Sequence, residues 1–211
     1  GEVVKQAVPH IGYLHRCAEK ICENLEYFKF IPYTDRMDYL GAFNNNLGFC
    51  LAVENLIEGL EVPKRAQYLR VMFAELNRIA SHLIAVGTYG LDIGAFTPFF
   101  YCWREREKVL SIFEKACGAR LTFSFTRLGG MLYDINDDIE KDIRAFCDEF
   151  EGKVEEYNNL LTFNKIFIDR TRDVGVITPD MAVDYGLSGP VLRGSGISRD
   201  LRKLEPYSSY E

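Results

Sequence analysis

The sequence predicts a mainly α-helical chain with only short strands, and three observations carry this prediction. Apolar residues recur every three or four positions through most of the chain, which is the period of a helix that buries one face. Asparagine, threonine and proline stand where such helices would begin, and glycine where one would end. Of the 211 residues, 47% are hydrophobic, which suffices for a substantial core. We therefore expect one mostly helical module over residues 1–211.

The first helix is expected between Leu14 and Pro32. Residues 2–6 alternate weakly, as a short strand remnant would, and residues 1–5 carry neither an initiator methionine nor an apolar signal core, which suggests a piece of a longer chain. Proline lacks the backbone N–H that a helix needs, so Pro32 is expected to end this helix. The helical spacing rests on Leu14, Ala18, Ile21, Leu25 and Phe28.

A second helix is expected over residues 36–59, with Asp35 as its N-cap and Asp38 in its first turn. Its apolar face would consist of Leu40, Phe43, Leu47 and Leu51. Residues 44–46 are three consecutive asparagines, which cannot all face a dry core. At least one of them is therefore expected to face a cavity or a partner.

A third helix is expected to start at Pro63 and to bury a broad apolar face up to Ile84. After it, glycines at positions 87, 90 and 94 are expected to loosen the backbone around Asp92. The pair Thr97 and Pro98 is typical of an N-cap followed by a first-turn proline, and predicts a fourth helix that ends at Gly118.

A fifth helix is expected to begin near Asn136 and to lie on the surface, because one of its faces is charged. Its apolar positions are Ile139, Ile143, Phe146, Phe150, Val154, Tyr157 and Leu161. Residues 178–180, Thr-Pro-Asp, predict a short helical turn, which a glycine-rich segment over residues 186–196 follows.

Composition narrows the possible functions. The formal net charge of −6 lacks the basic footprint of a nucleic-acid binder. The longest apolar stretches, residues 79–86 and 96–103, fall short of the roughly 20 residues that span a bilayer. Six cysteines occur without a CxxC pair, and the three histidines are not at helix-face metal spacing, so we expect reduced, mostly buried thiols and no metal site. The segment LRGSG at residues 192–196 lacks the spacing of a phosphate-binding loop.

The segment DRMDY at residues 35–39 is the first candidate for chemistry, because it brings a guanidinium, two carboxylates and a phenol together. Tyr39 could donate a hydrogen bond or a proton to a ligand, or it could be a half-buried packing tyrosine with Arg36 as an ion-paired neighbour. Asp92, between glycines in an apolar stretch, could be a partly desolvated acid that exchanges protons, or the cap of a turn.

Several blocks of the chain, in order, resemble one family. They are PHIGYLHRCAEK at residues 9–20, DRMDY at 35–39, LDIGAFTPFF at 91–100, RERE at 104–107, RLGG at 127–130, LRGSGI at 192–197 and DLRK at 200–203. These blocks are similar to those of the D subunits of respiratory complex I, the proton-pumping NADH:quinone oxidoreductase. That family is related to the large subunits of nickel-iron hydrogenases.

The resemblance implies the helical core of the fold that this family shares with hydrogenase large subunits. It implies one member of a multisubunit enzyme in the NADH-fed electron-transport chain, which passes electrons from a partner's iron–sulfur cluster to quinone and couples this step to proton translocation. The implied partners are the B subunit, which carries the cluster, the C subunit and the membrane-arm H subunit. The implied location is peripheral, at the cytoplasmic face of the inner membrane. Quinone would be the substrate, and this chain alone would bind no cofactor and be inactive.

The resemblance also implies site residues. The tyrosine matching Tyr39 hydrogen-bonds the quinone head group, and the aspartate matching Asp92 pairs with a pocket histidine and helps to deliver protons. The arginine matching Arg36 lies beside the cluster, where a fixed positive charge stabilises the reduced state. Arg120 matches a second arginine of the family, which also lies near the cluster.

Three departures from the family pattern matter. The pocket histidine belongs to an HPSTHG segment that would precede Gly1, so half of the head-group site lies outside this sequence. Thr122 stands where many members carry a histidine that links the cluster's potential to pH. Cys17 replaces the usual glycine of HRGxEK, which is expected to change the local backbone.

Three rival functions can be compared with this one. Nickel-iron hydrogenases need paired cysteines just after the arginine that matches Arg36, but no cysteine follows it here before Cys50, which excludes hydrogenase chemistry at this place. The equivalent component of a ferredoxin- or coenzyme F420-dependent membrane oxidoreductase remains an alternative. A non-catalytic scaffold is a further one.

Overall fold

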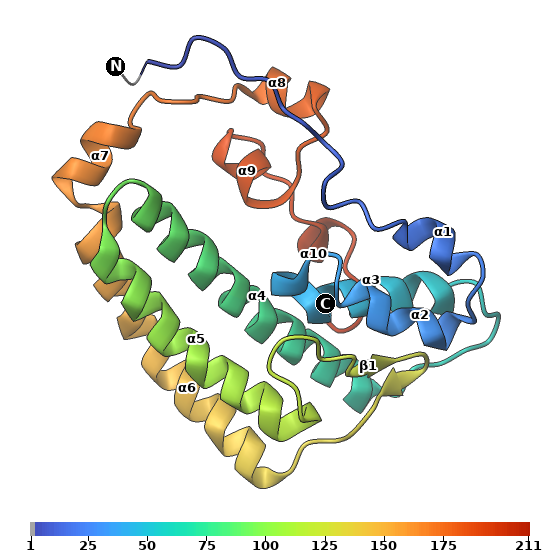
Figure 1. Cartoon of the computed structure of the whole chain (residues 1–211). Helices are drawn as coiled ribbons and strands as arrows, with labels where there is room; N and C mark the ends of the chain where they lie inside the picture. Colours follow the sequence, from blue (N-terminus) through green and yellow to red (C-terminus); the bar gives the residue numbers. More distant parts are fainter. Residues whose placement is uncertain (1–2) are drawn as a thin grey trace.

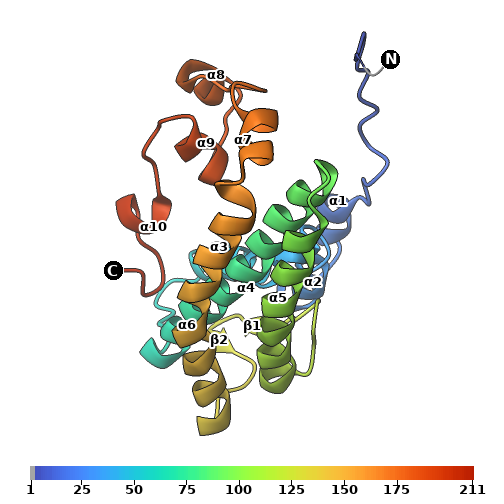
Figure 2. The same ribbon diagram turned by 90° about the vertical axis from the view of Figure 1, so that its left-hand side faces the viewer.

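The computed structural model describes residues 3–211 and is built around three long helices. α4 (Lys64–Asp92), α5 (Phe96–Cys117) and α6 (Asp137–Tyr157) lie side by side (Figure 1), and the view turned by 90° shows the same grouping (Figure 2). A turn at residues 93–95 reverses the chain, so α4 and α5 are antiparallel. The predicted mainly α-helical fold is confirmed.

Shorter elements surround these three helices. One group, which packs against α4, consists of α1 (Ala18–Cys22), α2 (Tyr27–Thr34), the 3-10 helix η1 (Tyr39–Gly41) and α3 (Ala42–Glu54). The strands β1 (Thr126–Arg127) and β2 (Gly130–Met131) form an antiparallel hairpin between α5 and α6 in the sequence. The last group consists of the π-helix η2 (Asn158–Thr162), α7 (Lys165–Thr171), α8 (Pro179–Asp184), α9 (Gly189–Gly194) and α10 (Leu201–Leu204).

The core is centred on five phenylalanines from α3, α4, α5 and the segment that precedes β1. Their ring centroids lie between 3.9 and 6.2 Å apart, in stacked, tilted and edge-on pairs. Burying each such side chain contributes about 1.5–3 kcal/mol. They are Phe43, Phe73, Phe113, Phe123 and Phe125. This cluster holds α3, and with it the DRMDY segment, against the long helices.

A buried ion pair fastens the small hairpin to the helices. Arg70 of α4 and Glu54 of α3 form a bidentate pair with nitrogen–oxygen distances of 2.5 and 2.9 Å. Arg70 Nη2 also donates to the carbonyl oxygens of Arg127 and Gly130, and Glu54 Oε1 accepts from the backbone N–H of Gly129. Each charge therefore has several polar partners, which a buried ion pair needs.

The N-terminal predictions are partly wrong. Residues 3–6 form no strand, and residue 2 lies outside the described part of the chain. The expected single helix is two short ones, α1 and α2, because Cys17 adopts a left-handed backbone and Leu14 is 93% exposed. Pro32 lies inside α2, which ends two residues later at Thr34.

The expected second helix begins later than predicted, at Ala42. Asp35 is not its N-cap but follows α2, and it is fully buried. Asp38 caps η1 instead, because its Oδ1 accepts a 3.2 Å hydrogen bond from the N–H of Leu40. Each of the three asparagines binds a backbone carbonyl oxygen within the chain. Asn44 binds the carbonyl oxygen of Ala74, Asn45 that of Asp38, and Asn46 that of Ile31.

The glycines near Asp92 have a different role from the predicted one. α4 continues through Gly87 and Gly90, so the backbone there is helical rather than loose. A Cβ atom at Gly87 would lie 3.3 Å from both Cys102 Cβ and Phe99 Cα of α5. These glycines therefore permit close helix packing. Only Gly94, at φ +94°, has the left-handed backbone of a turn.

The remaining helix ends mostly agree with the sequence. Asn136 and Thr178 cap α6 and α8 through their side chains, and Gly118 ends α5 at φ +77°. Thr97 is not a cap, because α5 already begins at Phe96. α6 lies at the surface with Ile139, Ile143, Phe146 and Tyr157 buried. No helix within residues 3–211 is long and apolar enough to cross a membrane.

Candidate functional site

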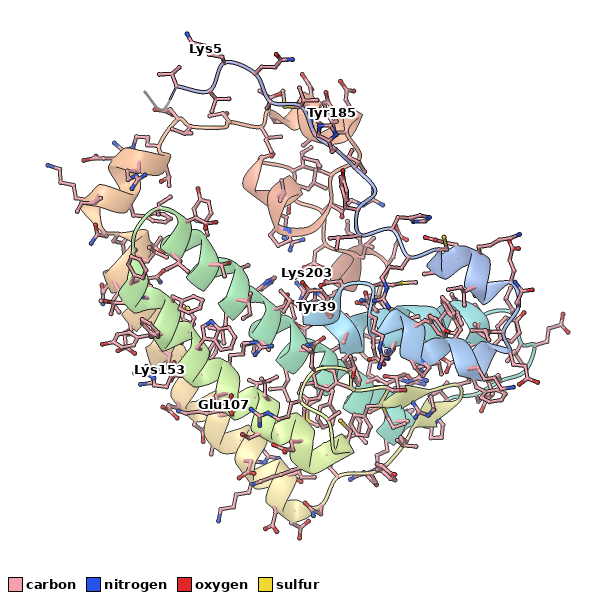
Figure 3. The ribbon with its side chains drawn as sticks, in the orientation of Figure 1. Lys5, Tyr39, Glu107, Lys153, Tyr185 and Lys203 are labelled. Carbon is pink, nitrogen blue, oxygen red and sulfur yellow. The ribbon has the colours of Figure 1, made fainter. Side chains whose placement is uncertain are left out.

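Tyr39 and Arg36 both lie at the surface in the link between α2 and α3. Tyr39 is the first residue of η1 and is 58% exposed; its position is marked in Figure 3. Arg36 is exposed, and its Nη1 donates a 2.6 Å hydrogen bond to the carbonyl oxygen of Pro32. It forms no ion pair within residues 3–211. The ion pair that the packing alternative expects for Arg36 is therefore absent from the described residues.

A network of hydrogen bonds holds the backbone beneath Tyr39. Asn77 of α4 donates to the carbonyl oxygen of Leu40 at 3.0 Å and accepts from the N–H of Phe43 at 3.1 Å. Asn45 donates to the carbonyl oxygen of Asp38 at 2.9 Å. A Cβ atom at Gly41 would lie 2.8 Å from Asp38 Oδ2, so a larger residue there would require the Asp38 side chain to move. Tyr39 is thus an exposed phenol on a fixed turn.

Asp35 connects this link to the segment after α5. It is fully buried, and its Oδ1 accepts a 3.1 Å hydrogen bond from the N–H of Ser124. Burial raises the pKa of Asp35 above 3.8, although hydrogen bonds from Ser124 and Asn46 and the charge of Arg36 act in the opposite direction. The contact brings residues 35–39 close to the segment that carries Arg120 and Thr122.

Arg120 is half-buried and anchored to α5. It pairs with Glu114 at 2.8 Å and also with Glu107. These two carboxylates hold the pKa of Arg120 above its usual value. Its charge is thus largely neutralised within the chain, which distinguishes Arg120 from Arg36.

Arg106 is a notable cation that the sequence interpretation missed. It is only 8% exposed, its Nε has no hydrogen-bond partner in the described chain, and its guanidinium lies 5.2 Å from the centroid of Trp103. Burial, together with the charge of Arg120, lowers the pKa of Arg106. The sequence could have indicated the burial of Arg106, because it lies on the same face of α5 as Cys102 and Val109, which are both buried.

Asp92 does not share a site with Tyr39 in this chain. It is the last residue of α4 and is exposed, so the predicted partial desolvation is absent. Asn77, which contacts η1, precedes it by 15 residues, which corresponds to roughly 22 Å along a helix axis. Arg170 of α7 donates a 2.6 Å hydrogen bond to the next carbonyl oxygen, that of Ile93.

A cavity of about 600 Å³ lies between α4 and the segment from α8 to Tyr207. Arg78 and His82 of α4 line one wall, and Arg193, Asp200 and Arg202 line another. Partial desolvation and the nearby charge of Arg78 lower the pKa of His82. The LRGSGI and DLRK blocks, which are neighbours in the sequence, therefore lie across one cavity from Arg78 and His82 of α4.

The thiols and histidines hold no metal cluster in this arrangement. All six cysteines are free; Cys50 and Cys102 are buried, whereas Cys17 and Cys147 are exposed, so the expectation of mostly buried thiols is only partly met. His10 and His15 lie in the exposed segment before α1. Over residues 3–211, no group of three or more histidine, cysteine, aspartate or glutamate side chains could hold a metal ion.

Comparison with known proteins places the chain among relatives of one kind. The family described as "Respiratory-chain NADH dehydrogenase, 49 Kd subunit" matches residues 92–211. The D subunit of the NADH-quinone oxidoreductase of Chlorobium luteolum is 50% identical over 210 residues, which are 100% of this chain and 53% of the relative. The D subunit from Chlorobium phaeobacteroides is 52% identical, over 100% of this chain and 52% of the relative.

A third relative, the NADH-quinone oxidoreductase D 2 subunit of Solibacter usitatus, is 57% identical over 201 residues, which are 95% of this chain and 54% of the relative. The chain thus spans about half the length of the curated relatives that it matches. The family match covers more than half of the chain and includes Asp92, the RERE block and both blocks of the cavity. The chain belongs to the family of the 49 kDa subunit of respiratory-chain NADH dehydrogenase.

Proposed function

We propose that this chain forms one side of the quinone head-group pocket in a multisubunit NADH:quinone oxidoreductase. In the complete enzyme, electrons would pass from an iron–sulfur cluster of a neighbouring subunit to quinone, and this step would be coupled to proton translocation. The B, C and H subunits would be its neighbours, and the chain would lie peripherally at the cytoplasmic face of the inner membrane. The names of the relatives support this role.

The observation that carries the proposal is the exposed phenol of Tyr39 on a backbone that the rest of the fold holds in place. Asn77, Asn45 and Asp38 fix the turn, yet the hydroxyl group has no partner within residues 3–211. A phenol that is positioned but free can donate a hydrogen bond to a carbonyl oxygen of a quinone.

Arg36 would supply the electrostatic part of the site. Its guanidinium is exposed and without a carboxylate partner in the described chain, so its positive charge is available to a neighbouring subunit. A cation beside a cluster stabilises the reduced, more negative state. Arg106 of α5, which has no ion pair among the described residues, adds a second cation, whereas Glu107 and Glu114 largely neutralise Arg120.

Asp92 is proposed to deliver protons through a histidine outside this sequence, as the resemblance implies. Two-electron reduction of a quinone consumes two protons, so donors are needed besides Tyr39. The exposure of Asp92 at the end of α4 leaves its carboxylate accessible to an imidazole from another segment. Because Asp92 lies roughly 22 Å along α4 from Asn77, the residue that fixes the Tyr39 turn, Asp92 would supply protons from a place separate from the Tyr39 site.

Replacing Tyr39 with phenylalanine in the assembled enzyme tests the proposal. The variant should lose most of its quinone reduction but keep NADH oxidation by an artificial acceptor, since that reaction bypasses the quinone pocket. Tyr33→Phe is the matched control, because Tyr33 is also exposed but stacks on Phe30 at 5.6 Å between centroids. Unchanged quinone turnover in Tyr39→Phe would remove the proposed role.

The rival functions make different predictions for the same variants. A component of a ferredoxin- or coenzyme F420-dependent enzyme would show the Tyr39→Phe defect without any NADH-driven activity. A scaffold would show no defect, and a photoreactive quinone analogue would not label Tyr39. The names of the relatives, which all include NADH and quinone, favour the first proposal.

A further inference from the structure

Arg106 of α5 is a buried cation that has no counter-charge in the described chain. Only 8% of its surface is exposed, and its guanidinium forms no hydrogen bond or ion pair with residues 3–211. Its Nε is fully enclosed without a partner, whereas Nη1 and Nη2 keep a small contact with solvent. Arginine keeps its proton in proteins, so this group is charged. A buried charge without a counter-charge is costly.

The other three charges of the RERE block are paired within the chain. Arg104 Nε donates to Glu105 Oε1 at 2.8 Å, and Glu107 pairs with Arg120. Residues next to each other on a helix do not face one another, so the two acids that flank Arg106 in the sequence point elsewhere. Among the described residues, Arg106 is therefore the one charge of this block that has no partner.

The surroundings of Arg106 within the chain do not replace a counter-charge. Its guanidinium carbon lies 5.2 Å from the ring centroid of Trp103, and this cation–π attraction offsets only part of the cost of burial. Burial lowers the pKa of Arg106, and the charge of Arg120 adds to this effect while that of Glu107 opposes it. Arg120 is a second cation, and Glu107 and Glu114 are already bound to it. The place therefore favours an anion from elsewhere.

The buried pair of Arg70 and Glu54 shows what such a guanidinium requires in this fold. Arg70 is 1% exposed, and the two carboxylate oxygens of Glu54 accept from its two Nη nitrogens at 2.9 and 2.5 Å. The planar fork of an arginine matches the two oxygens of a carboxylate in this way. Arg106 presents the same two nitrogens at its accessible end. A carboxylate that approaches end-on can therefore bind both of them.

From these contacts we propose that Nη1 and Nη2 of Arg106 bind a carboxylate side chain that residues 1–211 do not supply. The chain spans about half the length of its relatives, so this acid belongs either to the rest of the full-length protein or to a neighbouring subunit. Arg106 then anchors a segment that packs on α5 beside the exposed ring of Trp103. This role does not depend on quinone binding or on Tyr39. Once paired, Arg106 no longer adds its full charge to the surroundings of Arg36.

Arg106→Lys in the assembled enzyme gives the direct test. Lysine keeps the charge and adds a primary amine, which a carbodiimide joins by an amide bond to a carboxylate in contact with it. We expect a crosslink from position 106 to an aspartate or glutamate outside residues 1–211, which mass spectrometry of the digested enzyme identifies. The sequence of the linked peptide distinguishes the rest of the same protein from another subunit. A crosslink only within residues 1–211, or none, overturns the proposal.

Arg104→Lys is the matched control, two residues earlier on α5. Arg104 pairs with Glu156 of α6 at 2.8 Å, so this variant should give a crosslink to Glu156 inside the chain. That product shows that the reagent reaches this part of α5, and it makes the absence of a product in Arg106→Lys informative. The wild type carries arginine at both positions and should give neither crosslink, because a guanidinium does not form the amide.

Arg106→Met separates a paired cation from an unpaired one by the sign of its effect. If a carboxylate lies against Arg106, the variant leaves that carboxylate buried and unpaired, and thermal dissociation of the assembled enzyme should become about tenfold faster or more. If no carboxylate is there, the variant removes an unpaired buried charge and dissociation should slow. Arg144→Met, which breaks an exposed pair with Glu140, should change the rate by less than about threefold. Slower or unchanged dissociation of Arg106→Met overturns the proposal.

The acid that the crosslink identifies supplies the last test. Its replacement by the matching amide should shorten the lifetime of the assembled enzyme while Arg106 is present, because the cation is then unpaired. The same replacement in Arg106→Met should restore much of the lost lifetime, because neither charge remains without a partner. Effects of the two substitutions that simply add would overturn the direct contact between Arg106 and this acid.

Discussion

Asn77 of α4 holds Leu40 of η1 through a 3.0 Å hydrogen bond from its side-chain Nδ2 to the backbone carbonyl oxygen. The same amide accepts the N–H of Phe43, so one side chain fixes both ends of the turn that begins at Tyr39. Asn77 is only 2% exposed, and water cannot replace these bonds. The position of the exposed phenol therefore depends on a buried residue 38 positions later in the sequence.

Asn77→Ala should lower the free energy of unfolding by about 2–4 kcal/mol, because two buried hydrogen bonds are lost and two backbone groups are left without partners. Denaturant unfolding of the full-length protein measures this loss. Asn24→Ala, which removes an exposed amide bound to the carbonyl oxygen of Lys20, should change stability by less than about 0.5 kcal/mol. Similar values for the two variants would contradict the role of Asn77.

Gly87→Ala and Gly48→Ala should change stability in opposite directions. Both glycines lie inside helices, where alanine is more favourable by about 0.5–1 kcal/mol. A Cβ atom at Gly48 meets nothing within 4 Å, so that variant should gain this amount. At Gly87 it would lie 3.3 Å from backbone and side-chain atoms of α5, so we expect a net loss of about 1–3 kcal/mol. Thermal unfolding of the two variants compares them directly.

Cys17→Gly should stabilise the start of α1. Cys17 has φ 56° and ψ 34°, a conformation that costs a residue with a Cβ atom about 1–2 kcal/mol but costs glycine little. The N–H of Ile21 bonds to the Cys17 carbonyl oxygen at 3.0 Å, so its hydrogen exchange should slow about fivefold per kcal/mol gained. Cys17→Ala keeps the Cβ atom and should show no such slowing; equal protection in both variants would rule out backbone strain.

Glu75 should make the packing of the C-terminal segment, which carries Arg202 and Tyr210, against α4 dependent on pH. Burial alone would raise the pKa of Glu75, but hydrogen bonds from Tyr210 and Arg78 and the charge of Arg202 outweigh it and hold the pKa below 4.5. The stabilisation of the folded state by the Glu75 carboxylate is therefore complete above pH 4.5. It is lost as the pH falls through the lower pKa that Glu75 has in the folded state. Glu75→Gln should lose on the order of 1 kcal/mol at pH 7 and should not show this acid-dependent loss. Free energies of unfolding that decrease in parallel for the wild type and Glu75→Gln between pH 7 and pH 3 would contradict this.

The long helices were predictable because local signals decide them. The apolar spacing of α4 to α6 agrees with their buried faces, and the Asn136 cap and the Gly118 terminus lie where the sequence places them. Such signals involve residues within a few positions of one another. They can therefore be recognised in the sequence, although the helices gain most of their stability from packing against one another.

The failures arose where distant contacts override local preference. Asp35 looked like a cap because of its neighbours, but its burial depends on Ser124, which is 89 residues away. Gly87 and Gly90 looked like a loosened backbone, but the proximity of α5 and Leu161 makes glycine the residue that fits a packed helix. A resemblance identified Tyr39 and Arg36 but not Arg106. That the buried Nε of Arg106 lacks a hydrogen-bond partner can be seen only in the folded chain.

The buried pair of Arg70 and Glu54 has a consequence for the order in which this protein folds. Strands of two residues are too short to form a stable hairpin alone, and the carbonyl groups of this hairpin bond to a guanidinium 57 and 60 residues earlier in the chain. The α4–α5 pair can form from contacts near in sequence, whereas the hairpin must wait until α3 and α4 have met. We therefore expect the hairpin to become ordered late, and its amide protons to gain protection only when α3 has docked.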